Sequence, residues 1–148
     1  MPVTSKKTFI AIEAVLYVAK DASGLPVRSK SICEYQGVKL RYLEQIMQAL
    51  VKFGVLKGVR GPKGGYVLAK ERRKISLSEI YEAIFELENS ECGIESQSEL
   101  YEKVIRPVQS DAHDAVATYF SEMTIQDLCE DSVAKGIKTC ESSPDFNI

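Results

Sequence analysis

The sequence predicts a mainly α-helical fold that carries one small β-hairpin, and three observations lead to this prediction. Apolar residues recur at three- and four-residue spacing in several segments, which is typical of amphipathic helices. Two short apolar runs at 55–59 and 66–69 flank the glycine-rich basic turn RGPKGG, as the strands of a hairpin do. At 148 residues and 45% apolar content, the chain can form one compact domain or one small domain with a helical appendage.

The first helix is expected at 6–21, with Ser5 or Thr4 available as its N-cap. Gly24 and Pro26 follow it and interrupt the helical pattern. Residues spaced three and four apart mark its expected buried face: Phe9, Ile12, Leu16 and Ala19.

Two further helices are expected to form a helix-turn-helix pair. The shorter one fits 29–35, with Ser29 as its cap and Gly37 at its end. The longer one fits 39–53 and ends at Gly54. It carries an apolar stripe of Leu40, Leu43, Ile46, Met47 and Leu50. A separate polar stripe comprises Arg41, Gln45, Gln48 and Lys52.

The second half of the chain is expected to be helical around one loop. A helix fits 75–87 with Ser76 as its cap, whereas the acidic stretch 88–97 has little periodicity and is predicted to be a loop. A long helix fits 98–120, and Pro107 within it predicts a kink or a break. Its apolar stripe comprises Leu100, Val104, Val108, Ala112, Ala115 and Tyr119.

Charge divides the chain into two unlike parts. Residues 1–74 hold 15 Lys and Arg against 5 Asp and Glu, and residues 75–148 hold 4 against 16. A basic head that combines a helix-turn-helix with a basic hairpin has the layout of a winged helix-turn-helix, which docks on DNA. We therefore predict a winged helix-turn-helix DNA-binding domain at 1–74, an effector loop with dimerisation helices at 75–137, and a flexible tail at 138–148. Thr124 is expected to cap a short helix within the second part.

The second helix of such a pair enters the major groove with its N-terminal residues. Arg41 and Gln45 suit guanine and adenine edges, and Tyr42 with Lys39 suits phosphates. At the tip of the hairpin, Arg60 is predicted to enter the minor groove, where narrow geometry concentrates negative potential. The glycines of the turn are expected to allow close approach and positive φ. The full set of predicted DNA contacts is Ser29, Lys39, Arg41, Tyr42, Gln45, Gln48, Arg60, Lys63 and Gly64.

A long helix with an apolar stripe beside a small DNA-binding head favours a homodimer, because operators themselves consist of two half-sites. The alternative is that the stripe packs on its own domain. An enzyme has little support, since there is one histidine and neither an HExxH, a G-x-S-x-G nor a phosphate-loop motif. A protein-interaction module without DNA binding and an RNA-binding wing are further alternatives. No membrane span or signal peptide is expected, and four widely spaced cysteines indicate the reducing cytoplasm.

The segments LRYLEQ, VRGPKGGYVLA and EMTIQDL resemble the Rrf2 family, which includes IscR, NsrR and CymR, over about residues 3–134. The resemblance implies a homodimeric winged-helix transcription regulator whose long helices cross at the dimer interface. It implies DNA contacts at the positions given above. It also suggests a repressor that responds to a redox, iron–sulfur or sulfur-metabolism signal.

Iron–sulfur members of this family hold a cluster with three cysteines in the loop before the dimer helix. Here Cys92 is the only cysteine in that loop, and residues such as Gln97 and Lys103 fall where the others would stand. The histidine ligand of some members would fall near Arg106, so His113 cannot be assigned that role.

Three interpretations of Cys92 stay open. It is a cluster ligand helped by oxygen ligands such as Glu91, Glu95 or a partner residue, a redox-sensing thiol, or an inert residue. The flanking carboxylates, which include Glu88, argue against high thiol reactivity. The resembled family also includes cluster-free members controlled through sulfur metabolism or by binding a metabolic enzyme. The cofactor therefore stays open, and control by a partner protein or a small metabolite is an alternative.

Overall fold

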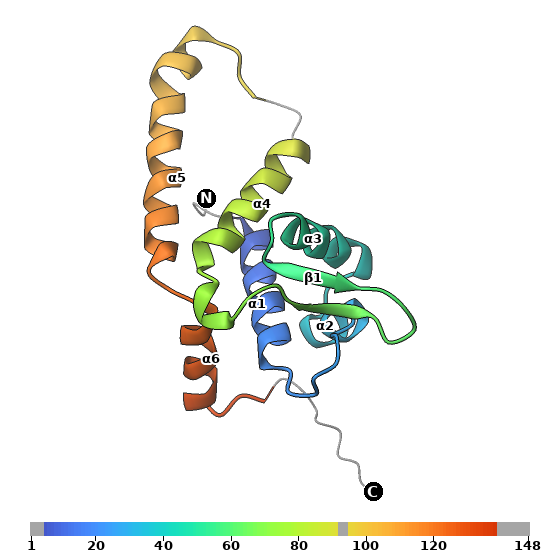
Figure 1. Cartoon of the computed structure of the whole chain (residues 1–148). Helices are drawn as coiled ribbons and strands as arrows, with labels where there is room; N and C mark the ends of the chain where they lie inside the picture. Colours follow the sequence, from blue (N-terminus) through green and yellow to red (C-terminus); the bar gives the residue numbers. More distant parts are fainter. Residues whose placement is uncertain (1–4, 92–94, 139–148) are drawn as a thin grey trace, which may run out of the picture.

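The computed structural model describes residues 5–91 and 95–138, and it confirms the predicted fold class (Figure 1). Six helices surround a two-stranded antiparallel hairpin within the described residues. The elements in order are α1 (Lys6–Lys20), α2 (Ser29–Gln36), α3 (Leu40–Lys52), β1 (Leu56–Val59), β2 (Gly65–Leu68), α4 (Leu77–Glu91), α5 (Arg106–Ser121) and α6 (Ile125–Ala134). A 3₁₀ turn at Arg72–Lys74 precedes α4, and a π-helical turn at Tyr101–Ile105 precedes α5.

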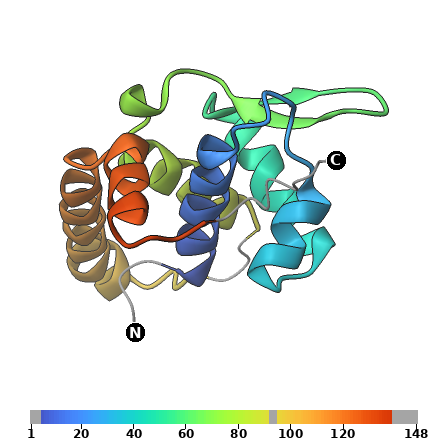
Figure 2. The same ribbon diagram turned by 90° about the horizontal axis from the view of Figure 1, so that it is seen from below.

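Helix α1 lies at the centre of the molecule, between α2 and α3 on one side and α5 and α6 on the other (Figure 2). Its buried face carries small and β-branched residues, namely Ala11, Ile12, Ala14, Val15 and Val18. The prediction that Phe9 is buried was wrong. Phe9 is 54% exposed, because its ring meets that of Phe120 only edge-on. Leu40 is likewise half-exposed, because it is the first residue of α3 and lies outside the buried core. The largest fully buried side chains include Ile32, Leu43, Ile46, Met47, Leu50, Ile75, Ile80, Ile84 and Ile125.

Three of the four predicted N-caps are confirmed, and one is wrong. The Ser5 hydroxyl accepts from the Thr8 N–H at 3.3 Å, and Thr124 caps α6 as expected. Ser76 caps α4 in a reciprocal arrangement with Glu79, which stands three residues later. Ser29 is not a cap, because it already lies inside α2 and its hydroxyl points to α3.

Helix α4 is longer than predicted, so the expected loop at 88–97 begins later. Residues 88–91 continue the helix, and an ion pair of 2.9 Å between Lys7 Nζ and Glu91 Oε1 holds its last residue. Cys92, the sequence's candidate sensor, lies outside the described residues.

The long C-terminal helix continues through Pro107 by a local change in winding. Because proline has no N–H and its ring collides with the carbonyl four residues earlier, a regular turn is disfavoured there. The preceding turn widens instead, and the Arg106 N–H bonds the Tyr101 carbonyl five residues back. The helix leaves its predicted apolar stripe exposed, with Leu100 at 68% and Val108 at 62%. None of the helices in the described part of the chain has the length and apolar character of a membrane span.

Candidate nucleic-acid interface

Helix α3 separates a buried face from an exposed polar face, as its two stripes predict. Leu43, Ile46, Met47 and Leu50 are fully buried. Arg41, Gln45 and Gln48 are exposed, and Lys39 stands exposed at the N-cap. These four residues are therefore accessible on a helix whose orientation is fixed by the core, whereas Tyr42 is partly buried against that core.

A polar network fixes α3 against its neighbours. Glu44 Oε1 accepts from the Tyr66 hydroxyl of β2 at 3.1 Å and from the Ser29 hydroxyl of α2 at 3.3 Å. Gln48 Nε2 donates to the same Tyr66 hydroxyl at 3.4 Å. Burial, and after it the charge of Glu44, raises the pKa of Tyr66, so the hydroxyl keeps its proton as a donor. One carboxylate thus connects the helix-turn-helix to the hairpin.

The hairpin, here called the wing, carries Arg60 and Lys63 on an exposed turn. Two backbone hydrogen bonds between Val27 and Tyr66, of 2.9 and 2.8 Å, attach the wing to the segment before α2. The Arg28 guanidinium also donates to the Pro62 carbonyl at the tip. These contacts restrict the wing to one orientation relative to α3.

The wing glycines are needed for two different reasons. Gly61 has φ +109°, a conformation that side chains disfavour. Gly64 does not have the expected positive φ, but a Cβ there would lie 2.2 Å from the Val59 carbonyl oxygen. A Cβ on Gly65 would lie 2.5 Å from the Val27 carbonyl oxygen, so both glycines permit close backbone approach.

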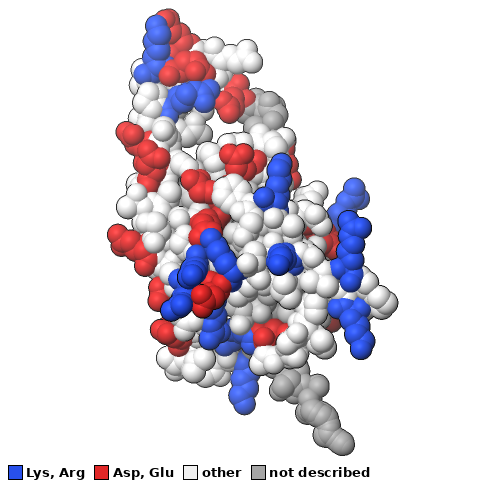
Figure 3. Space-filling view, in the orientation of Figure 1, with Lys and Arg blue, Asp and Glu red and all other residues white. Residues whose placement is uncertain are grey.

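Positive charges on α3 and the wing lack carboxylate partners. Within the described ranges, no ion pair involves Lys39, Arg41, Lys52, Lys57, Arg60 or Lys63. By contrast, Lys103, Arg106 and Lys135 in the second half are all paired with acidic residues. Figure 3 shows Lys and Arg along the edge where the wing lies, and Asp and Glu along α5 on the opposite edge. The uncompensated charge is therefore concentrated on the side predicted to contact phosphates.

Several residues that shape this surface were not predicted from the sequence. Lys7 Nζ lies 5.6 Å from the centroid of the Tyr42 ring, and Glu44, Tyr66 and Arg28 form the contacts described above. Their partners are 15 to 84 positions away in the chain, a distance that periodicity does not reach. A hydroxyl or carboxylate at a half-buried helix position is the weak signal that could have indicated them.

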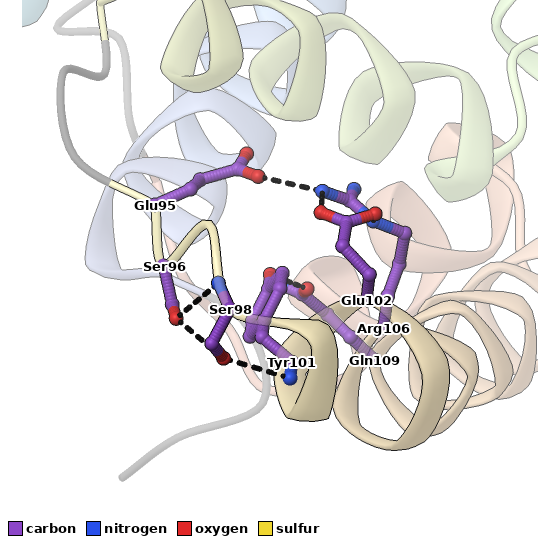
Figure 4. A network of polar contacts seen from close by, with 7 residues as sticks. All are labelled: Glu95, Ser96, Ser98, Tyr101, Glu102, Arg106 and Gln109. Carbon is purple, nitrogen blue, oxygen red and sulfur yellow. Dashed lines mark hydrogen bonds and ion pairs between the residues drawn. The ribbon is translucent and has the colours of Figure 1, made fainter.

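The region expected to sense a signal holds an ionic cluster at the start of the long helix (Figure 4). Arg106 donates to Glu102 at 2.7 and 3.0 Å and to Glu95 at 3.0 Å. The hydrogen bond from Arg106 lowers the pKa of Glu102, and the same contact raises the pKa of Arg106. The Ser98 hydroxyl accepts a hydrogen bond of 3.0 Å from the Tyr101 N–H at the start of this helix. A guanidinium thus lies between two carboxylates at the start of the long helix.

The described residues do not form a ligand set for an iron–sulfur cluster. No group of three or more His, Cys, Asp or Glu among them could hold a metal ion. Cys33 and Cys129 are buried in different parts of the fold, and burial raises the pKa of the Cys33 thiol. His113 is engaged elsewhere, with Nδ1 3.0 Å from the Tyr81 hydroxyl and Nε2 2.9 Å from Glu82. Cys92 and Cys140 lie outside the described residues.

Comparison with known proteins gives consistent matches. The Rrf2 family of iron-dependent transcriptional regulators matches residues 4–131. An HTH-type transcriptional regulator of Haemophilus influenzae is 34% identical, over 99% of this chain and 96% of its own length. IscR of Escherichia coli is 42% identical over 86 residues, which cover 58% of this chain and 52% of IscR.

Solved structures show the same likeness. IscR of T. potens superposes with a TM-score of 0.66 at 28% identity, over 91% of both chains. CymR of B. subtilis, named the global cysteine regulator, superposes with a TM-score of 0.64 at 26% identity, over 88% of this chain and 98% of CymR. These relatives are regulators of transcription and not enzymes. With a winged-helix head and a match over most of its length, the chain belongs to the Rrf2 family of transcription regulators.

Proposed function

We propose that this protein binds double-stranded DNA as a homodimer and represses transcription in response to a redox, iron–sulfur or sulfur-metabolism signal. The carrying observation is the set of exposed cations on α3 and the wing that form no ion pair with any described residue. Such a surface favours phosphates, because binding releases condensed counterions. Because a transcription regulator must reach DNA, we propose that the protein is located in the cytoplasm.

In this proposal α3 enters the major groove. Arg41 and Gln45 contact base edges, while Lys39 and Tyr42 contact phosphates. Gln48 lies one turn further along the same face and also supports Tyr66. Ser29 is 7% exposed and contributes through its hydrogen bond to Glu44.

The wing supplies the second contact. Arg60 enters the minor groove and Lys63 contacts a neighbouring phosphate, since both are exposed at the tip of the turn. Gly64 contributes by having no side chain, because a Cβ there would collide with the Val59 carbonyl and move the tip. We propose residues 1–74 as the DNA-binding unit and 75–137 as the unit for effector response and dimerisation, with 138–148 as a tail of which residues 139–148 are not described.

The dimer is proposed to form through the long helix. Its apolar stripe of Leu100, Val104, Val108 and Tyr119 is more than half exposed at each position. Contiguous apolar surface on a folded protein marks an interaction site. A two-fold pair of chains would also present two α3 helices to the two half-sites of an operator.

The nature of the signal is supported by the relatives. CymR of B. subtilis is named a cysteine regulator. A solved structure of CymR of Staphylococcus aureus is of an oxidised form. A second candidate is cluster-free control by a partner protein or a small metabolite. The observation behind this second candidate is the ionic cluster around Arg106, which joins Glu95 to the long helix through side chains alone. Iron and acid-labile sulfide content of protein purified without oxygen separates the two modes.

The test of DNA binding begins with selection of duplexes from a random pool by the purified protein. Anisotropy titrations of the selected duplex at several salt concentrations should then give a steep negative slope of log affinity against log salt. Failure to enrich any sequence, with binding independent of salt, would favour a protein-interaction module instead. In vitro transcription from a promoter that contains the selected site tests repression, and higher transcript levels would identify an activator.

A further inference from the structure

Lys7 lies where three helices meet. It belongs to the first turn of α1, and its ammonium group lies 2.9 Å from Oε1 of Glu91, the last residue of α4. The same nitrogen lies 5.6 Å from the centroid of the Tyr42 ring, in the first turn of α3. The Lys7 side chain is only 15% exposed, although lysines are rarely buried unless they are paired.

The ion pair with Glu91 places the Lys7 ammonium group beside the Tyr42 ring. An ammonium group within about 6 Å of an aromatic centroid is attracted by the ring quadrupole, and this attraction grows when water is excluded. Leu43, the next residue, is fully buried and fixes the backbone, whereas the Tyr42 ring is only partly covered. The ring packs against the core on one side, and Lys7 supplies a polar contact that can orient it.

We propose that Lys7 is a positioning residue for DNA recognition, which orients Tyr42 on α3 and is itself held in place by Glu91. This inference rests on the proposed DNA binding through α3. Lys7 acts through Tyr42 and not as a phosphate contact of its own, because its ammonium is mostly buried and already paired. No property of Lys7 in the sequence separates it from its neighbour Lys6.

The position of Glu91 gives this contact a regulatory consequence. Glu91 directly precedes residues 92–94, and Glu95, directly after them, is paired with Arg106 at 3.0 Å. Glu91 is thereby attached to α1 and, through Lys7, lies near Tyr42 of α3, whereas Glu95 is attached to the long helix. A change that displaces Glu91 releases Lys7, and the Tyr42 ring loses its support.

Lys7→Met tests the proposal, because methionine keeps the length of the side chain and removes the charge. Lys6→Met is the matched control, since Lys6 is exposed and its ammonium group forms no hydrogen bond or ion pair with other described residues. Both variants are titrated against a duplex selected by the unaltered protein. We expect Lys7→Met to weaken binding about three- to tenfold, as the loss of a cation–π contact would, and Lys6→Met to change it less than about twofold. Lys7→Arg should restore binding, because arginine can pair with Glu91 and stack on Tyr42.

A double-mutant cycle separates positioning from direct contact. In a Tyr42→Leu background, Lys7→Met should cause no further loss, and Glu91→Gln should likewise add little to Lys7→Met. An undiminished effect of Lys7→Met in the Tyr42→Leu background would overturn the proposal, and so would equal affinities of the Lys6 and Lys7 variants. Far-ultraviolet circular dichroism and thermal unfolding check that each variant is folded. If the unaltered protein binds no duplex, the proposed function fails together with this inference, whereas binding with an inert Lys7 refutes the inference alone.

Discussion

Replacement of Tyr66 by phenylalanine should uncouple α3 from the wing without disturbing the core. The ring of Tyr66 is 9% exposed and would stay packed, while its hydroxyl bonds to Glu44 at 3.1 Å and to Gln48 at 3.4 Å would be lost. A hydrogen bond to a charged group contributes about 1.5–3 kcal/mol, and the lower end applies because Glu44 is only partly buried and keeps its bond from Ser29.

We therefore expect Tyr66→Phe to reduce the free energy of unfolding by about 1.5 kcal/mol, which lowers the Tm of a chain of this size by about 3–6 °C. Affinity for the selected DNA should fall as well, because the angle between α3 and the wing is less restricted. Tyr35→Phe is the matched control, since Tyr35 is exposed and no hydrogen bond of its hydroxyl is found within the described residues. Equal Tm values for the two variants would refute the assigned role of the Glu44 network.

The raised pKa of Tyr66 adds a pH dependence to this experiment. A tyrosine whose pKa is higher in the folded protein stabilises the fold fully below its unfolded pKa of about 10, and that stabilisation is lost as the pH rises through the folded value. The Tm difference between the unaltered protein and Tyr66→Phe should therefore be constant at neutral pH and shrink above about pH 10. A difference that persists at high pH would contradict the assignment of the proton to Tyr66.

Three further predictions concern the wing and the long helix. Arg60→Ala should weaken DNA binding and reduce the salt slope by about 1, and unchanged affinity at moderate salt would exclude Arg60 from the interface. Gly65→Ala should destabilise the fold by about 2 kcal/mol, because its Cβ meets the Val27 carbonyl, whereas Gly58→Ala meets no atom within 4 Å and should be neutral in the same thermal unfolding assay. Val108→Asp should weaken self-association about a hundredfold or more in sedimentation equilibrium, since each subunit loses an exposed apolar side chain that the proposed dimer would bury, while Ser110→Asp on the opposite face should not. A monomeric unaltered protein would refute the dimer.

The predictable part of this fold is the part encoded by local patterns. The stripe of Leu43, Ile46, Met47 and Leu50 fixed the orientation of α3, and caps such as Thr124 fixed where helices begin. Phe9 and Leu40 were misjudged because spacing identifies a helical face but not where along the helix the neighbouring elements stop. The extension of α4 to Glu91 was missed for a related reason, since the contact that holds it comes from Lys7, 84 positions earlier.

In the second half of the chain, ion pairs attach Glu95 to the long helix. Arg106 pairs with Glu95 and Glu102, and these charge-assisted bonds hold the segment after residue 94 against the helix without a metal. Helix α4 in turn is joined to α5 through His113, which bonds Tyr81 and Glu82 and packs its ring 4.0 Å from that of Phe85. Because the opposite face of α4 carries Ile80 and Ile84 in the core of the head, a shift of α5 must move α4 or break these polar contacts. The ion pairs are exposed and therefore weak and screened by salt, whereas the His113 contacts are mostly covered. Glu95, whose ion pair with Arg106 is exposed on both sides, is thus held more weakly than α4, and displacing Glu95 needs less free energy than breaking the His113 contacts.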